Sequence, residues 1–254
     1  MKTIEIFIRS LLFNAAFFCV TLAMMICAFP TVFMKRERGM AVVYAWVKTV
    51  YVLEKTLLGL DYEVRGRENV PQGQAFLLAA KHQSAYETMK LHLLLGDPAI
   101  VLKRELLSIP MWGRFLNIID PVAIDRGNRE EAMKSLLAGV QHVKDQGRPI
   151  VIFPQGTRVM PDAVPTEKPY KVGIGRMYVS SGLAIVPLAL NSGIFWPRHS
   201  WFKRPGKVVF EFLPPIAAGL PITEVMAMLQ DRLEDASNAL TAEARAAYPW
   251  LPRA

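Results

Sequence analysis

The sequence predicts an α/β protein in which an N-terminal, membrane-associated segment of two helices precedes a single α/β domain with a mixed, largely buried sheet flanked by helices. Two observations support this fold class. Residues 10–33 contain no charged side chain, as expected of a helix in contact with lipid. After residue 61, short apolar runs alternate with stretches of helical periodicity, which is typical of strands that alternate with helices. We therefore expect membrane-anchoring helices in residues 1–60 and the α/β domain in residues 61–254.

The first of these segments is long enough to cross a bilayer. As a helix, residues 10–33 would extend about 36 Å, against about 30 Å for the hydrocarbon core. A cleaved signal peptide is the alternative, but the apolar run exceeds a usual signal sequence and no clear small-x-small cleavage site follows. Residues 40–60 are expected to form an amphipathic helix that packs on the first or lies at the interface. The pair could span the membrane or dip into it.

Composition favours a membrane as the partner. The chain of 254 residues is 52% hydrophobic with a net charge of +8, which excludes a disordered protein. Both cysteines, Cys19 and Cys27, lie in the apolar segment, so no disulfide framework or cysteine-based zinc site is available. Residues 1–60 carry seven basic and three acidic side chains, so half of the net charge belongs to the predicted anchor. Since no basic stretch is interleaved with aromatics, we expect no nucleic-acid partner.

Six short apolar runs after residue 61 are predicted to be buried strands. They cover residues 75–80, 99–102, 122–124, 150–153, 183–190 and 208–212. Two helices are also predicted. One covers residues 129–146, with Asn128 as N-cap, Glu131 completing a capping box and Gly147 after its end, and the other covers residues 223–246.

Several common catalytic motifs are missing. No serine has glycines two residues before and after it, no complete G-x-G-x-x-G or P-loop is present, and the histidines lack metal-ligand spacing. Serine-esterase, classical dehydrogenase and nucleotide-hydrolysis chemistry are therefore disfavoured.

A histidine and a carboxylate follow the first predicted strand. His82 comes two residues after it, where open α/β sheets gather reactive groups, and Glu87 lies five residues further on. On one continuous helix these side chains would point about 140° apart. We therefore expect His82 to precede the first helical turn, with Ser84 as the N-cap. Glu87 could then orient the imidazole and stabilise its protonated form, as a general base requires.

The same spacing recurs at His92 and Asp97, so spacing alone is a weak signal. His92 lies inside a leucine-rich stretch, and Asp97 lies in a Gly-Asp-Pro turn. We interpret His92 as a packed or half-exposed helix residue without a catalytic role.

A second cluster follows the strand predicted over residues 150–153. It consists of Phe153, Pro154, Gln155, Gly156, Thr157 and Arg158. A turn built on the proline and glycine would present backbone N–H groups and direct the arginine at an anion. An ordinary turn with a solvated arginine is the alternative.

Basic residues also follow the second and third predicted strands. They are Lys103, Arg104 and Arg126. Together with Arg158 they would share one rim of the sheet, which suits a phosphate site, although each could be simple surface charge.

Taken in order, these residues resemble the 1-acyl-glycerol-3-phosphate acyltransferase family, also called lysophosphatidate acyltransferases, within the glycerolipid acyltransferases. The family has four blocks: H-x-x-x-x-D, a segment running from a lysine through I-P and G to I-D-R, F-P-E-G-T-R, and V-P-x-x-x. Here they correspond to residues 82–87, 103–129, 153–158 and 186–191. The resemblance extends over residues 61–215. Glu87 stands where the family has Asp, and Gln155 stands where it has Glu.

The resemblance implies an acyltransferase that needs no cofactor and no metal. His82 would take the proton from the free hydroxyl of 1-acyl-glycerol-3-phosphate, which attacks the thioester of acyl-CoA or acyl carrier protein and yields phosphatidate, while Glu87 orients the imidazole. Lys103, Arg126 and Arg158 would hold the acceptor phosphate. Gly156 and its turn, residues 153–157, could offer backbone donors to the oxyanion.

The resemblance also implies a location and leaves alternatives open. Membrane lipid would be a partner, and the expected location is the cytoplasmic face of a bacterial inner membrane. Because Gln155 removes a charge beside Arg158, the acceptor could be another lyso-lipid, such as lyso-ornithine lipid. A non-catalytic membrane protein that binds lipid is the alternative from a different class, and it predicts that His82→Ala leaves function intact.

Overall fold

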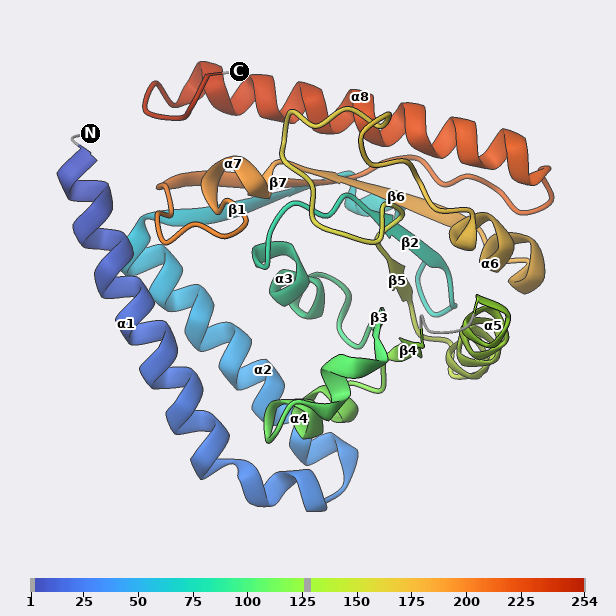
Figure 1. Cartoon of the computed structure of the whole chain (residues 1–254), viewed down its shortest axis with the longest axis horizontal. Helices are drawn as coiled ribbons and strands as arrows, with labels where there is room; N and C mark the ends of the chain where they lie inside the picture. The colour runs from blue at the N-terminus through green and yellow to red at the C-terminus, as the bar shows by residue number, and fades with distance from the viewer. Residues whose placement is uncertain (1–2, 126–128, 254) are drawn as a thin grey trace.

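Seven strands form one sheet in the computed structural model, which describes residues 3–125 and 129–253 (Figure 1). The strands are β1 (Leu60–Arg65), β2 (Leu77–Ala80), β3 (Ala99–Lys103), β4 (Val122–Ile124), β5 (Ile150–Ile152), β6 (Ile185–Leu190) and β7 (Gly206–Phe212). Their order across the sheet is β1-β7-β6-β2-β5-β3-β4. Neighbours are parallel except β6 and β7, so the sheet is mixed, as predicted.

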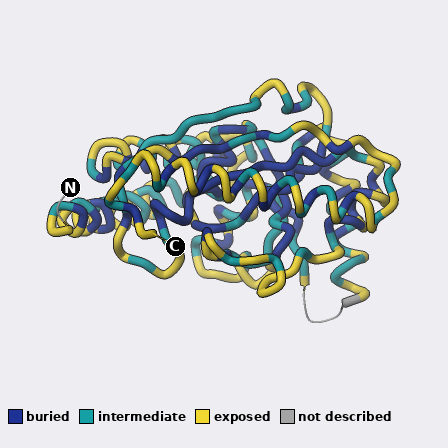
Figure 2. The backbone as a smooth tube through the Cα atoms, turned by 90° about the horizontal axis from the view of Figure 1, so that it is seen from above, coloured by how far each residue is buried: buried dark blue, intermediate teal, exposed yellow. Residues whose placement is uncertain are grey.

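Helices cover both faces of this sheet, and Figure 2 shows the buried chain enclosed between them. They are α1 (Thr3–Cys27), α2 (Arg36–Leu53), α3 (Tyr86–Leu95), α4 (Trp112–Ile118), α5 (Arg129–Asp145), α6 (Gly173–Ser181), α7 (Ser192–Phe195) and α8 (Ile222–Ala247). Leu78 and Ala80 of β2 pack with residues of α1, α2 and α3, while Leu77 and Ala79 pack with residues of α5, α6 and α8. This alternation buries both faces and explains why β2 is a continuous apolar run.

The six predicted strands are all present, and β1 is an additional one. Its sequence, LDYEVR, alternates apolar and polar residues and is mostly half-buried, so a search for continuous apolar runs misses it. β1 lies at the edge of the sheet and pairs in parallel with β7. The predicted helices correspond to α5 and α8. Asn128, the predicted cap of α5, lies outside the described residues.

The two N-terminal helices form a hairpin against one side of the domain (Figure 1). Within the described part of the chain, α1 alone is long and apolar enough to cross a membrane. Yet Phe13 of α1 and Val47 of α2 are fully buried in the same core as strands β2, β6 and β7. α1 therefore contributes to the core of the domain, and the choice of a retained anchor over a cleaved signal peptide stays a prediction.

A buried ion pair attaches α3 to the N-terminal hairpin. Lys90 of α3 binds Glu54, which begins the short π-helix Glu54–Leu58 after α2, and both side chains are inaccessible to solvent. The ammonium also lies 4.5 Å from the ring centroid of Tyr86 and 5.2 Å from that of Tyr51. These contacts fix the position of α3, whose first turn carries Glu87.

Candidate active site

His82 and Glu87 meet at the carboxyl end of β2. His82 Nδ1 lies 2.8 Å from Glu87 Oε1, and His82 precedes α3 as the spacing predicts. The predicted cap, Ser84, is one position early, since Ala85 directly precedes the helix. The Ser84 hydroxyl nevertheless accepts the backbone N–H of Tyr86 at 3.1 Å.

The Glu87 carboxylate is fully buried and held by further donors. Its Oε1 accepts the backbone N–H groups of Gln83 at 2.8 Å and Ser84 at 2.7 Å, and its Oε2 accepts the hydroxyl of Ser192 at 2.6 Å. Because an ionised carboxylate can only accept, neutral His82 must carry its proton on Nδ1. The lone pair of Nε2 is then left to take a proton from a substrate.

Ser192 is a site residue that the sequence reasoning missed. It begins α7, directly after β6, and lies 105 residues from Glu87 along the chain. No local motif marks it, because its role arises only when β6 and β2 lie side by side.

The imidazole of His82 is stacked on Phe153, with ring centroids 3.9 Å apart and planes inclined by 20°. The backbone N–H of Val159 also donates to the His82 carbonyl at 2.8 Å. The side chain of His82 remains 18% exposed and lines a cavity. The first and third sequence blocks are thus in direct contact, and the ring is fixed with one edge accessible.

The turn after β5 is built as the sequence predicts, but one of its amides is occupied. Gly156 adopts φ 67°, in the left-handed region, and its N–H donates to the carbonyl of Phe153 at 2.9 Å. Gly156 therefore offers no free N–H to an oxyanion in this conformation, contrary to our expectation for that residue. Gln155 is buried and its Nε2 donates to the carbonyl of Lys168 at 3.2 Å, while Thr157 lines the cavity.

Two of the predicted basic residues share this cavity with His82. Lys103, at the end of β3, and Arg158 both line it, as does Lys171, which was not predicted. Arg126 lies outside the described residues. Arg104 instead donates to the hydroxyl of Ser135, at 3.4 Å, and does not line the cavity. Of the four basic residues expected at one rim of the sheet, two, Lys103 and Arg158, line the same cavity.

The cavity has a volume of about 1030 Å³ and extends from His82 to the N-terminal hairpin. We call it the His82 cavity. Its walls are mostly apolar side chains of α1, α2, α4 and α5, including Met24, Met25, Val43, Trp46, Phe115, Leu116, Met133 and Leu136. A long apolar cavity beside a candidate base suits a substrate with an acyl chain.

The pair with the same spacing, His92 and Asp97, does not form a second site. Asp97 binds Arg36 at 2.7 Å and Arg148 at 3.2 Å. His92 is buried within α3, and burial lowers the pKa of its imidazole to about 4. The interpretation of His92 as a packed helix residue is confirmed.

The charged residue beside His82 is engaged elsewhere. Lys81, its neighbour, is buried and pairs with Glu234 of α8, which also accepts the hydroxyl of Tyr170 at 2.8 Å. Within residues 3–125 and 129–253, no three His, Cys, Asp or Glu side chains are grouped to hold a metal ion.

Known proteins with similar sequences are acyltransferases. A protein family described as Acyltransferase matches residues 61–191. A 1-acyl-sn-glycerol-3-phosphate acyltransferase of Pseudomonas aeruginosa is 35% identical over 199 residues, covering 78% of this chain and 76% of that protein. Another, of Saccharomyces cerevisiae, is 29% identical and covers 68% of this chain and 57% of its own length.

A solved structure has the same fold. The crystal structure of the 1-acyl-sn-glycerophosphate acyltransferase PlsC from Thermotoga maritima superimposes with a TM-score of 0.73. The match covers 92% of this chain and 97% of that chain, at 21% sequence identity. The predicted α/β class with an apolar N-terminal helix is confirmed.

Proposed function

This chain belongs to the acyltransferase family, as its four ordered blocks predicted, and from this we propose a reaction. The protein transfers an acyl chain from an acyl thioester to the free hydroxyl of 1-acyl-glycerol-3-phosphate, giving phosphatidate. The His82–Glu87 pair carries the proposal. His82 lines a cavity whose walls combine basic residues with many apolar side chains.

In the proposed reaction, Nε2 of His82 removes the hydroxyl proton as the acceptor oxygen attacks the thioester carbonyl. The new C–O bond forms a tetrahedral intermediate, which collapses with cleavage of the C–S bond. The imidazolium then returns its proton to the departing thiolate. Glu87 maintains the Nδ1–H tautomer and stabilises the imidazolium throughout.

The phosphate of the acceptor would bind at the basic end of the cavity. Lys103 and Arg158 line that end, and the family resemblance adds Arg126. Arginine can grip phosphate through two parallel hydrogen bonds, whereas lysine acts as a point charge. Since residue 155 is an amide and not a carboxylate, no negative charge at this position competes with the phosphate for Arg158.

The acyl chains would lie in the apolar part of the His82 cavity, between α1 and α2. The protein associates with a membrane through α1, so a bilayer-dissolved substrate can reach the cavity without crossing water. We extend the proposal to the cytoplasmic face of a bacterial inner membrane, because acyl-CoA and acyl carrier protein, the two candidate donors, are cytoplasmic.

The test is acyl transfer by purified protein in detergent, with lysophosphatidate as acceptor and each donor supplied in turn. We expect His82→Ala to lower kcat by about 10²–10⁴-fold, the usual contribution of a general base. His142→Ala is the matched control, because His142 lies exposed on α5. Equal activity of wild type and His82→Ala would contradict the mechanism and favour a non-catalytic lipid-binding role. Activity restricted to another lyso-lipid, such as lyso-ornithine lipid, would reassign the acceptor.

A further inference from the structure

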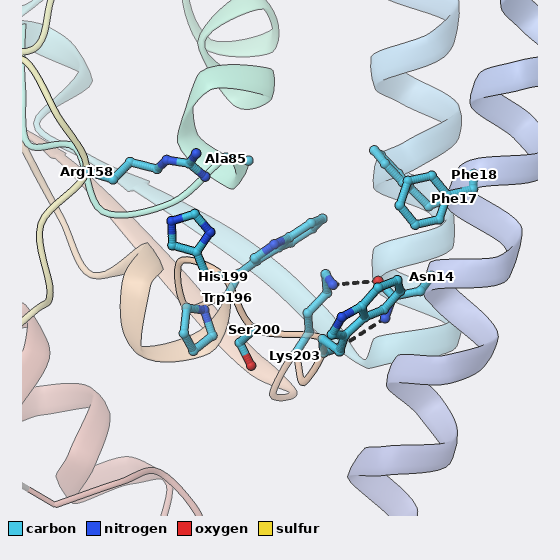
Figure 3. Close-up of a pocket in the computed structure, with 11 residues that line it drawn as sticks. Asn14, Phe17, Phe18, Ala85, Arg158, Trp196, His199, Ser200 and Lys203 are labelled. Atoms are coloured by element: carbon cyan, nitrogen blue, oxygen red, sulfur yellow. Dashed lines mark hydrogen bonds between the residues drawn. The ribbon is translucent and has the colours of Figure 1, made fainter.

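A second cavity, of about 380 Å³, lies between α1 and residues 196–203, the segment that follows α7 (Figure 3). We call it the Lys203 pocket. Four residues line both this pocket and the His82 cavity: Phe17, Ala85, Arg158 and Trp196. The two spaces are therefore neighbours.

Lys203 places a positive charge in this pocket without a negative partner. The residue is only 4% exposed, and its Nζ donates to Asn14 Oδ1 at 2.6 Å while lying 4.6 Å from the ring centroid of Trp196. No carboxylate among the described residues lies within ion-pair distance of Lys203. Burial of an ammonium without a counter-ion is costly, and here burial lowers its pKa to about 8.

The remaining lining is suited to an anion. Besides Lys203, the pocket is lined by Arg158 and His199, and none of its eleven described residues is acidic. Ser200 also lines it, but its hydroxyl donates to the carbonyl of Phe202 at 3.2 Å. Figure 3 shows His199 beside the guanidinium of Arg158. His199 adopts φ 57°, in the left-handed region that histidine enters more often than most non-glycine residues. Its Nε2 accepts Arg198 Nε–H at 2.9 Å, which leaves Nδ1–H as a donor.

The mouth of the pocket lies where a lipid headgroup would be. Trp201 is 67% exposed and lines the pocket together with Phe18, another exposed aromatic residue of α1. Their ring centroids are 6.3 Å apart, and Phe202 is similarly close to Phe7 of α1, at 5.6 Å. Exposed tryptophan beside an apolar membrane helix is typical of the interface between hydrocarbon and water. An anion in this pocket would thus be part of a lipid.

We propose that the Lys203 pocket binds the phosphate-bearing headgroup of the lipid acceptor as it enters from the bilayer, before the phosphate moves past Arg158 into the His82 cavity. The proposal rests on the proposed function for the identity of the acceptor. It assigns a binding role to Lys203, a residue outside the four sequence blocks that lies twelve residues after the end of the fourth.

A purely structural role for Lys203 would require its charge to attach α1 to the domain. The ammonium makes one bond to α1, to Asn14 Oδ1, but three further bonds do not involve it. Ser10 Oγ donates to the Lys203 carbonyl at 3.0 Å and accepts the Lys203 N–H at 2.9 Å, and Asn14 Nδ2 donates to the carbonyl of Trp201 at 3.0 Å. A methionine at position 203 would keep all three bonds while removing the ammonium.

Two variants test the role of the Lys203 ammonium. Lys203→Met removes the positive charge, whereas Asn14→Asp keeps it but places a carboxylate beside it that pairs with it in place of a ligand. Both should raise the KM for lysophosphatidate about tenfold, a usual effect of losing one charged contact, while kcat and the KM for the acyl donor stay near wild type. Lys207→Met is the matched control, because it removes the same charge from a half-exposed side chain on β7.

Binding to vesicles provides a readout that does not depend on catalysis. Wild type should prefer phosphatidylcholine vesicles containing lysophosphatidate over vesicles of equal charge containing phosphatidylglycerol, and both variants should lose this preference. Unchanged KM and unchanged preference in both variants would overturn the proposal, even with acyl transfer intact. Equal binding of wild type to the two vesicle types would overturn the proposal as well. So would binding of inorganic phosphate at the pocket with no preference for lysophosphatidate over phosphate.

If wild type transfers no acyl chain to lysophosphatidate, the proposed function fails, and vesicle binding alone then decides on the pocket. An added thermal unfolding measurement separates the structural role. A role limited to attaching α1 predicts that Lys203→Met lowers Tm and that Asn14→Asp, which strengthens the link, leaves KM unchanged; that pair of results would overturn the proposal.

Discussion

Acid should destabilise this protein through His92, and the size of the effect follows from its burial. The pKa of the buried imidazole is lowered to about 4 from an ordinary value of 6.5. Between these values the unfolded chain binds a proton at this residue that the folded chain does not. Stability from His92 is therefore fully present above about pH 6.5 and is lost as the pH falls toward about 4. At pH 5 the two pKa values give a loss of about 2 kcal/mol.

The variant His92→Leu removes this titration and keeps an apolar side chain in a leucine-rich helix. Urea unfolding in a mild detergent at pH 7 and at pH 5 should show wild type losing about 2 kcal/mol more stability than the variant. His142→Leu, at an exposed position of α5, serves as the control and should follow wild type. If wild type and His92→Leu lose stability in parallel, His92 is not held neutral by burial and the reasoning is refuted.

Three further predictions concern the site and the support of α3. Glu87→Gln should lower kcat by about 10²–10⁴-fold with little change in the KM of the acceptor, measured by initial rates, because a neutral amide cannot stabilise the imidazolium of His82; an unchanged kcat would exclude that role. Ser192→Ala removes one donor from the buried carboxylate and should cost about 1–3 kcal/mol of stability in chemical unfolding, together with a several-fold loss of kcat; wild-type values for both would show that Oε2 needs no partner. Lys90→Met leaves Glu54 buried without its cation and should cost about 3–5 kcal/mol, whereas the double variant with Glu54→Leu should recover most of this loss in the same unfolding assay; no recovery would show that packing, not charge, dominates there.

The parts of the site that sequence reasoning predicted are those governed by local geometry. The position of His82 before α3 follows from the strand that ends at Ala80, because a helix cannot bring residues five apart onto one face. Residues 153–158 likewise follow a strand end, and parallel strands bring their carboxyl ends to one edge of the sheet.

The missed parts depend on contacts between distant segments. Ser192 reaches Glu87 only because β6 lies beside β2, and the strand order of a mixed sheet is not written in any local pattern. The occupied N–H of Gly156 depends on how tightly its turn closes. The Lys203 pocket is similarly unpredictable, since it joins α1 to a segment near the other end of the chain. The boundary at residue 60 stays a prediction.

The attachment of α1 to Lys203 also determines when during synthesis the fold can be completed. Ser10 and Lys203 are 193 residues apart, and β1 cannot pair with β7 until the same late part of the chain is made. At about 5–20 residues per second, the ribosome needs about 10–40 s to produce the partner of a helix that has already emerged. During that interval the most apolar segment of the chain can pack against α2 but not against the domain. The nascent chain should therefore depend on early delivery to the bilayer. Lipid would then cover the apolar surface of α1 until the part of the domain that buries it has been made.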